Sequence, residues 1–127
     1  MYQNIILVGI VGKEPEMRYT PAGKAAASFR LATSESYWKG EDKSESVTTW
    51  WTVTCWGQTA ERVYAQVKKG MKLLVEGRIK PGDDGNPRKF TRKDGSTGTT
   101  YEMTASVVRI LDKIEKSEPE GDEEVMW

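Results

Sequence analysis

Residues 47–56, VTTWWTVTCW, constrain the fold more than any other stretch, because their side chains separate at a period of two. One face receives Trp50, Thr52, Thr54 and Trp56, and the other receives Trp51, Val53 and Cys55. Only the second face has the composition of a protein core. We therefore expect a half-buried β-strand that presents two tryptophans on the side facing away from the core.

Four further stretches show the composition or alternation of strands. They are residues 2–11, 26–34, 71–80 and 101–111. In the second of these, Phe29 and Leu31 lie on one side and Arg30 on the other, so the Arg30 side is expected to face water or a ligand. In the third, the residues expected to face inward are Met71, Leu73, Val75 and Ile79.

Residues 58–69 change to a helical period. The apolar side chains that recur at this spacing are Ala60, Val63, Tyr64 and Val67. Lys68 and Lys69 are expected in the last turn of the helix, and Gly70 is expected to be its C-cap. This stretch is the one helix that the sequence predicts.

The order is three strands, one helix and two strands, with Gly9 and Gly77 where strands can bend. Residues 39–46 are expected to form a loop, and residues 81–100 to form turns on either side of a short run at 88–91. This arrangement predicts an all-β fold, a five-stranded barrel of the oligonucleotide/oligosaccharide-binding (OB) type with one inserted helix. Such a barrel would close its own sheet edges.

Several classes of function are excluded by composition. The chain has no histidine and one cysteine, Cys55, so imidazole-based catalysis, Cys/His zinc sites and internal disulfides are not expected. Asp83, Asp84 and Asp94 adjoin glycines in turns and lack the spacing of a calcium loop. Cys55 is expected to be a core residue. We expect no enzyme, metal, cofactor, signal peptide or membrane span.

Charge is unevenly distributed, although the chain has 19 basic and 19 acidic residues. Residues 112–127 hold seven acidic and two basic side chains, a net charge of −5, and the remainder is therefore +5. This difference predicts a folded domain at residues 1–111, with a surface that binds a polyanion, and a separate acidic tail at residues 112–127. Composition leaves open whether the tail competes for that surface, docks elsewhere or is a solvated end that adds solubility.

Aromatic and basic residues are interleaved in a way typical of proteins that bind nucleic acid without reading its sequence, because unstacked bases need flat rings and the backbone needs cations. Besides Trp50 and Trp56, the candidates are Tyr37, Trp38 and Phe90, the last within the basic run 88–93. The alternative is that these rings fill a core or subunit interface, as large aromatics often do. We accept that alternative for Trp51.

Six segments resemble, in order, the signatures of the bacterial-type single-stranded DNA-binding proteins. They are IILVG at 5–9, PEMRYTPAG at 15–23, LATSES at 31–36, WG at 56–57, KKG at 68–70 and VEGR at 75–78. The resemblance covers residues 3–111, and it implies an OB barrel that assembles as a homotetramer and wraps single-stranded DNA.

The resemblance also implies roles for individual residues. Base stacking would fall to Tyr37, Trp50, Trp56 and Phe90, with Trp38 as a possible extra surface. Phosphate contacts would fall to Arg18, Lys69, Lys80, Arg88 and Lys89, to which we add the outward-facing Arg30. The implied function is to coat exposed strands in DNA replication, recombination and repair, in the cytoplasm and in association with the nucleoid.

The tail departs from the family pattern, because it lacks the long Gly/Pro/Gln-rich linker and the Pro-Phe tip. It keeps an acidic run followed by apolar residues, namely Asp122, Glu123, Glu124, Val125, Met126 and Trp127. We expect this tail to dock on replication and repair proteins, with Trp127 in place of the usual aromatic.

Two other binding functions stay open. The chain could be an OB-fold protein-interaction module of a replication assembly, and the discriminating feature is whether Trp50 and Trp56 are solvent-exposed in the free assembly. An RNA-binding OB protein of the cold-shock kind would also stack bases, but the chain lacks the closely spaced Gly-Phe aromatic signature of that group.

Overall fold

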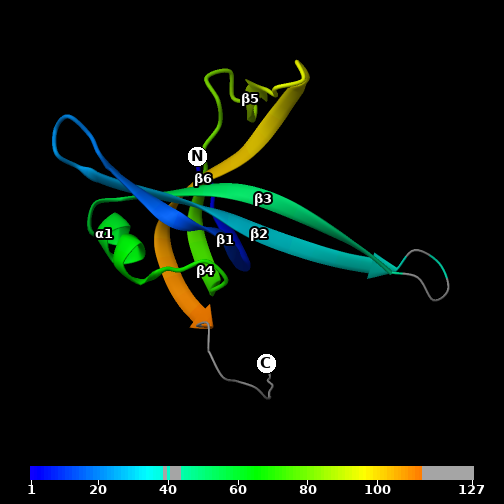
Figure 1. Ribbon diagram of the computed structural model, residues 1–127, viewed down its shortest axis with the longest axis horizontal. Coiled ribbons are helices and arrows are strands. Elements are labelled where there is room, and N and C mark those ends of the chain that lie inside the picture. The colour runs from blue at the N-terminus through cyan, green and yellow to red at the C-terminus, as the bar shows by residue number, and fades with distance from the viewer. Residues whose placement is uncertain (39, 41–43, 113–127) are drawn as a thin grey trace.

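The computed structural model describes residues 1–38, 40 and 44–112. Within these ranges, strands and one helix follow each other as β1 (Ile5–Tyr19), β2 (Ala25–Trp38), β3 (Ser44–Trp56), α1 (Gly57–Gln66), β4 (Lys72–Ile79), β5 (Arg88–Thr91) and β6 (Thr97–Asp112) (Figure 1). The predicted all-β fold with one inserted helix is confirmed, and the short run at 88–91 forms a strand of its own.

Five strands close into a ring. Their order is β3-β2-β1-β4-β6, and β6 returns to β3 through a parallel pairing that runs from Trp51 opposite Tyr101 to Thr54 opposite Thr104. The other neighbouring strands pair antiparallel, and β5 pairs only with β6. This closed ring with α1 between β3 and β4 is the arrangement expected of an OB fold.

The core lies inside the ring, where alternate residues of the strands point. Val53 and Cys55 are fully buried there, as the alternation in β3 predicts, and Trp51 is half-buried against the same cluster. Burial raises the pKa of the Cys55 thiol to about 12, although the nearby Arg62 charge opposes the shift. Cys55 is therefore a neutral core residue at physiological pH.

Helix α1 packs against β1, β2, β3 and β6 and buries Ala60 and Val63. It ends earlier than predicted, because Val67 already has extended backbone and buries its side chain in the core. Lys68 and Lys69 therefore follow the helix, and Gly70 is not its C-cap. The Gly70 N–H instead donates to the Val11 carbonyl of β1. No helix among the described residues is long and apolar enough to cross a membrane.

Strands β1, β2 and β3 are longer than the sequence predicts. The first strand was expected at residues 2–11, but β1 continues to Tyr19 through register shifts on both sides of Lys13. The second shift, between Lys13 and Glu16, takes in Pro15, which has no N–H to donate to the ladder. Ser44–Ser46 were expected to be loop but lie in β3, opposite the end of β2. The β2–β3 hairpin therefore projects from the ring as a long arm (Figure 1).

The predicted inward pattern is found at Leu73 and Val75 of β4 and at Met71, directly before the strand, and all three are buried. Ile79 was also expected inward, but this prediction is wrong, because the side chain is 49% exposed where β4 ends and the chain turns toward solvent. The pairing of β4 with β6 shifts register between Glu76 and Gly77, at the predicted bend.

Candidate nucleic-acid interface

The outer face of the β2–β3 hairpin carries the two predicted tryptophans. The pairing is unbroken from Ala26 opposite Trp56 to Trp38 opposite Ser44, so alternate residues keep one face along the whole hairpin. Trp50 and Trp56 lie on the face away from the core and are 45% and 38% exposed. Because a strand rises about 3.3 Å per residue, their attachment points are about 20 Å apart.

Arg30 and Trp38 share that face, because their pairing partners Thr52 and Ser44 are an even number of residues from Trp50. We call Trp38, Arg30, Trp50 and Trp56 the outer strip. Tyr37 precedes Trp38 directly and therefore lies on the opposite face, where its hydroxyl donates to Glu45 Oε1 at 3.2 Å. The structure does not bring Tyr37 together with the outer strip.

A groove at one end of the outer strip combines both predicted contact types. Its volume is about 290 Å³, and Arg18 of β1, Trp56 at the end of β3 and Lys80 after β4 all line it. Lys24, in the β1–β2 turn, places its Nζ 5.4 Å from the centre of the Trp56 ring. Three separate segments thus bring cations beside one exposed ring, and Lys24 was not predicted.

Trp50 lies across β1 at Gly12. A Cβ at that position would collide with the Trp50 ring, so glycine is what allows the ring to rest there. The Arg30 guanidinium carbon lies 5.2 Å from the ring centre on the outer strip. Arg30 and Thr52 also line a shallow hollow of about 110 Å³ next to this ring.

Phe90 lies on β5 opposite Gly98 of β6. A Cβ on Gly98 would come within 2.6 Å of the Phe90 ring, so the glycine leaves room for the aromatic. Phe90 is 40% exposed, and the Arg92 guanidinium carbon lies 5.4 Å from its centre. Trp50, Trp56 and Phe90 therefore each combine an exposed ring with a cation nearby.

Arg88 is held by a carboxylate that the sequence did not single out. Its Nε and Nη2 donate to Oε2 of the buried Glu102 at 2.9 and 2.5 Å, and the Thr100 hydroxyl lies 2.8 Å from the same oxygen. Burial alone raises the pKa of Glu102, but these hydrogen bonds and the Arg88 charge outweigh it and lower the pKa. Arg88 thus anchors β5 to β6, which no local sequence pattern indicates.

Like Arg30 and Arg88, the predicted phosphate contacts Lys89 and Lys69 lie outside the Trp56 groove. Lys89 is exposed on β5, opposite Thr99. Lys69 is exposed in the turn after α1, and its backbone N–H donates to Glu14 Oε2 at 3.2 Å. Glu14 also lines the hollow beside Arg30, so this turn borders the outer strip at Arg30, between Trp50 and Trp56.

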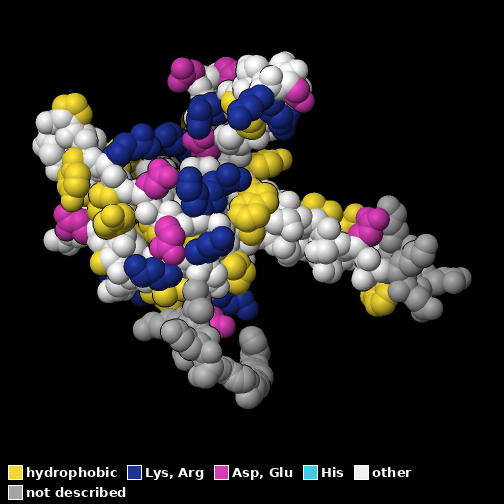
Figure 2. Space-filling model, viewed as in Figure 1, with side chains coloured by type: hydrophobic (Ala, Val, Ile, Leu, Met, Phe, Trp, Pro, Cys, Tyr) yellow, Lys and Arg dark blue, Asp and Glu magenta, His cyan; other side chains and the backbone are white. Residues whose placement is uncertain are grey.

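Figure 2 shows Lys and Arg side chains gathered over the ring and the β5–β6 hairpin, whereas the projecting β2–β3 arm carries few on this face. Across the described ranges, no cluster of three His, Cys, Asp or Glu side chains could hold a metal ion. The predicted docking residues Asp122, Glu123, Glu124, Val125, Met126 and Trp127 lie outside the described residues.

Comparison with known proteins gives concordant matches. The model of the single-strand binding protein family matches residues 2–111. Two single-stranded DNA-binding proteins of Neisseria meningitidis, from serogroups A and B, are each 35% identical over 107 residues, which cover 84% of this chain and 58% of theirs. The chain thus spans little more than half the length of these relatives.

Solved structures show the same fold. The small single-stranded DNA-binding protein from Streptomyces coelicolor aligns with a TM-score of 0.70 at 25% identity, over 86% of this chain and 94% of its own. The Plasmodium falciparum SSB complex with ssDNA aligns with a TM-score of 0.68 at 24% identity, over 88% and 97% of the two chains. The second likeness concerns the fold alone.

Proposed function

Because the chain belongs to the single-strand binding protein family, we propose that it binds single-stranded DNA without reading sequence and coats exposed strands in replication, recombination and repair. The observation that carries this proposal is the outer strip, where Trp50 and Trp56 are exposed with cations beside them. Both tryptophans are exposed in the single chain, and the interaction-module alternative is distinguished by whether they stay exposed in the free assembly.

The proposed mechanism is stacking combined with phosphate neutralisation. Unpaired bases stack on Trp50, Trp56 and Phe90, and each stacked base contributes about 1–3 kcal/mol. Arg18 and Lys80 flank Trp56 in its groove, where they would contact the phosphates on either side of a stacked base. A duplex hides the faces of its bases, so it binds more weakly. Binding involves no covalent step and no cofactor.

A stacking base would replace the cation that lies beside each ring. In the free protein the cations of Lys24, Arg30 and Arg92 lie 5.4, 5.2 and 5.4 Å from the ring centres of Trp56, Trp50 and Phe90, respectively. A base that stacks on a ring takes the position of the cation, which then turns to a phosphate of the same strand. Stacking and phosphate contact are thereby coupled at each ring.

A fluorescence titration tests this function. Tryptophan emission should fall on addition of oligo(dT) but not of a matched duplex, at both low and high salt, because stacking quenches indole emission. Trp51→Phe serves as the control variant, because Trp51 packs against the core and its replacement should leave the affinity for oligo(dT) unchanged. Equal responses to single strand and duplex would contradict the proposal.

We also propose self-association, with a homotetramer as the expected assembly. Ile6, Val8 and Ile10 alternate outward on β1 and are 56%, 46% and 42% exposed, and Leu74 of β4 pairs beside Val8. A row of adjacent apolar side chains is typical of a subunit interface. Val8→Glu should therefore reduce the mass measured by sedimentation equilibrium, whereas Lys93→Glu should not. An unchanged mass for Val8→Glu would remove this surface from the proposal.

Residues 1–111 are proposed as the DNA-binding domain, and residues 112–127 as a tail that docks on replication and repair proteins. The proposed location is the cytoplasm, in association with the nucleoid. Deletion of residues 119–127 should weaken the capture of such proteins and leave the affinity for oligo(dT) largely intact. If capture of every such protein is unchanged, the docking role is wrong.

A further inference from the structure

Phe90 and the outer strip lie on one continuous surface. The parallel pairing sets Thr52 of β3 opposite Glu102 of β6, and paired residues of neighbouring strands point to the same side. Met103 is buried in the core, so Glu102 beside it points outward, as Thr52 does. The β5–β6 pairing places Phe90 opposite Gly98, an even number of residues from Glu102. The aromatic ring of β5 therefore shares a face with the outward tryptophans of β3.

Glu102 lies on this surface between the Trp56 groove and β5. Its carbonyl accepts a hydrogen bond from the N–H of Lys80, which lines that groove. Its Oε2 accepts hydrogen bonds from Nε and Nη2 of Arg88, at the start of β5. The Thr100 hydroxyl donates to the same oxygen. One buried acidic residue thus connects the groove with the strand that carries Phe90.

The Arg88–Glu102 pair should stay intact when DNA binds. The Glu102 side chain is 7% exposed, whereas that of Arg88 is 60% exposed. A phosphate that pulled Arg88 away would leave a buried carboxylate without its partner, which is strongly unfavourable. Because a guanidinium has five N–H donors, the edge that carries Nη1 stays available to a phosphate oxygen while Glu102 holds the other edge.

Strand β5 depends on this contact for its position. Among the described residues it pairs only with β6, over the four residues Arg88–Thr91. A two-stranded hairpin is marginally stable by itself, so side-chain contacts to the rest of the sheet decide how firmly it is held. The contact from Arg88 to Glu102 joins the start of β5 to the part of β6 that pairs with β3.

We propose that Glu102 is a positioning residue for single-stranded DNA. By holding Arg88, it directs the available edge of the guanidinium toward the phosphates and keeps Phe90 on the face of the outer strip. This inference rests on the proposed function, because it concerns the same surface. It adds to that function a residue that touches neither base nor phosphate.

The sign of one substitution separates positioning from simple charge. Glu102→Gln removes a negative charge from the binding surface and nearly preserves the shape of the side chain. Charge alone predicts tighter binding of oligo(dT), because a carboxylate repels phosphates. Positioning predicts binding that is weaker by about 5- to 10-fold, the lower part of the range for loss of one stacked base. Fluorescence anisotropy with a labelled oligonucleotide measures the difference.

Glu16→Gln is the matched control. Glu16 faces outward on β1, opposite Ser28, and lines the hollow beside Arg30. The substitution therefore removes the same charge from the same face, but Glu16 holds neither Arg88 nor β5. It should leave the affinity for oligo(dT) unchanged or raise it.

A double-mutant cycle locates the effect on the surface. In the Phe90→Ala background, Glu102→Gln should weaken binding less than it does in the unmodified chain, because the ring that it positions is absent. In the Trp56→Ala background the full effect should remain. Thr100→Val removes one hydrogen bond from the Glu102 carboxylate and leaves both charges in place, so it should cause a smaller loss of affinity.

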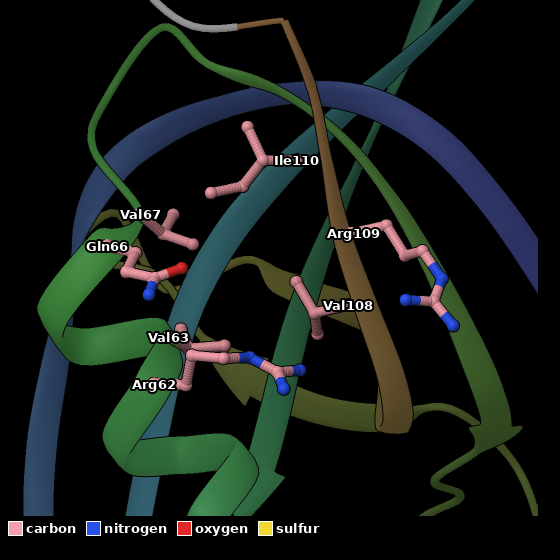
Figure 3. Close-up of a pocket in the computed structure, with 7 residues that line it drawn as sticks. All are labelled: Arg62, Val63, Gln66, Val67, Val108, Arg109 and Ile110. Atoms are coloured by element: carbon pink, nitrogen blue, oxygen red, sulfur yellow. The ribbon is translucent and has the colours of Figure 1, made fainter.

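Hydrogen exchange without DNA measures how firmly β5 is held. Glu102→Gln should speed the exchange of backbone amides at residues 88–91 and 97–100. The groove of about 430 Å³ between α1 and β6 provides the internal reference (Figure 3). Its lining residues Val63, Val67, Val108 and Ile110 belong neither to the outer strip nor to the Arg88–Glu102 pair. Their exchange should not change, which would show that the variant is folded.

Tighter or unchanged binding by folded Glu102→Gln would overturn the proposal, and so would an equal loss in the Phe90→Ala background. If the reference amides also exchange faster, Thr100→Val decides, and an unchanged affinity in that variant would overturn the proposal. Failure of the unmodified chain to prefer oligo(dT) over duplex would contradict the proposed function instead, and the exchange experiment would still show whether Glu102 holds β5.

Discussion

The two faces of β3 differ sharply in exposure. Val53 and Cys55 are 0% exposed, whereas Trp50 and Trp56 on the same strand are 45% and 38% exposed. The inner residues contact other strands of the ring and α1, and the outer rings contact cations and a glycine. Neighbouring residues of β3 therefore serve different purposes: the inner residues stabilise the fold, and the outer rings are available to bind DNA. Substitutions on the inner face should lower stability, and those on the outer face should lower affinity.

The largest expected effect is on the inner side. Leu31 of β2 is fully buried opposite Trp51, and Leu31→Ala should lower the free energy of unfolding by about 2–5 kcal/mol, because it leaves a cavity in a closed ring. Chemical denaturation measures this loss. The folded fraction should keep its affinity for oligo(dT), and a large loss of affinity without destabilisation would contradict the separation of the two faces.

The matching change on the outer side is Trp56→Ala. It should weaken binding to oligo(dT) by about 1–3 kcal/mol, roughly 5- to 150-fold, because one stacked base loses its ring. The melting temperature should change little, because the ring is partly in water and contacts Lys24 rather than the core. Anisotropy with a labelled oligonucleotide gives the affinity. A strong drop in melting temperature at unchanged affinity would make Trp56 a structural residue.

A smaller effect should come from Lys80→Gln at the edge of the same groove. The slope of log K against log salt should become less steep by about 0.7, because one phosphate contact on a single strand is removed. Arg62→Gln on α1 is the control, because Arg62 lies outside the Trp56 groove, and its slope should match that of the unmodified protein. Equal slopes for Lys80→Gln and the control would remove Lys80 from the interface.

The smallest effect concerns Glu102 and pH. Its pKa in the folded chain is below the ordinary value of 4.5, so its stabilising contribution is present above that value and is lost as pH falls through the folded-state pKa. Resonances of β5 around Phe90 should therefore shift in acid. Glu102→Gln should abolish this titration, and a titration that persists in the variant would assign it to another carboxylate.

The sequence predicts β3 and its neighbours well, because alternation at a period of two translates directly into two faces once a strand pairs without register shifts. This is the case from Ala26 to Trp38, and it explains why Trp50 and Trp56 were assigned outward correctly. The helix end was not predictable in this way. The Lys-Lys-Gly signature resembles a helix terminus, but burial of Val67 in the core ends α1 first.

The candidate site was only partly predictable, because several of its contacts depend on register between distant segments. Arg88 and Glu102 meet only through the β5–β6 pairing, and Lys24 reaches Trp56 from a turn. Tyr37 and Trp38 are adjacent in the sequence and were both predicted to stack bases, yet the β2–β3 pairing places them on opposite faces of the hairpin. Residue types alone indicate which side chains could bind, and the tertiary pairing decides which of them act together.

The parallel contact between β3 and β6 also has a consequence for how the chain reaches its native state. Trp51 pairs with Tyr101, so this contact joins segments that are separated in the sequence by α1, β4 and β5. The β2–β3 hairpin can form early, because its two strands are local in sequence. The ring should close late and limit the refolding rate, so variants in the Trp51–Thr54 contact should slow refolding more than variants at the hairpin tip.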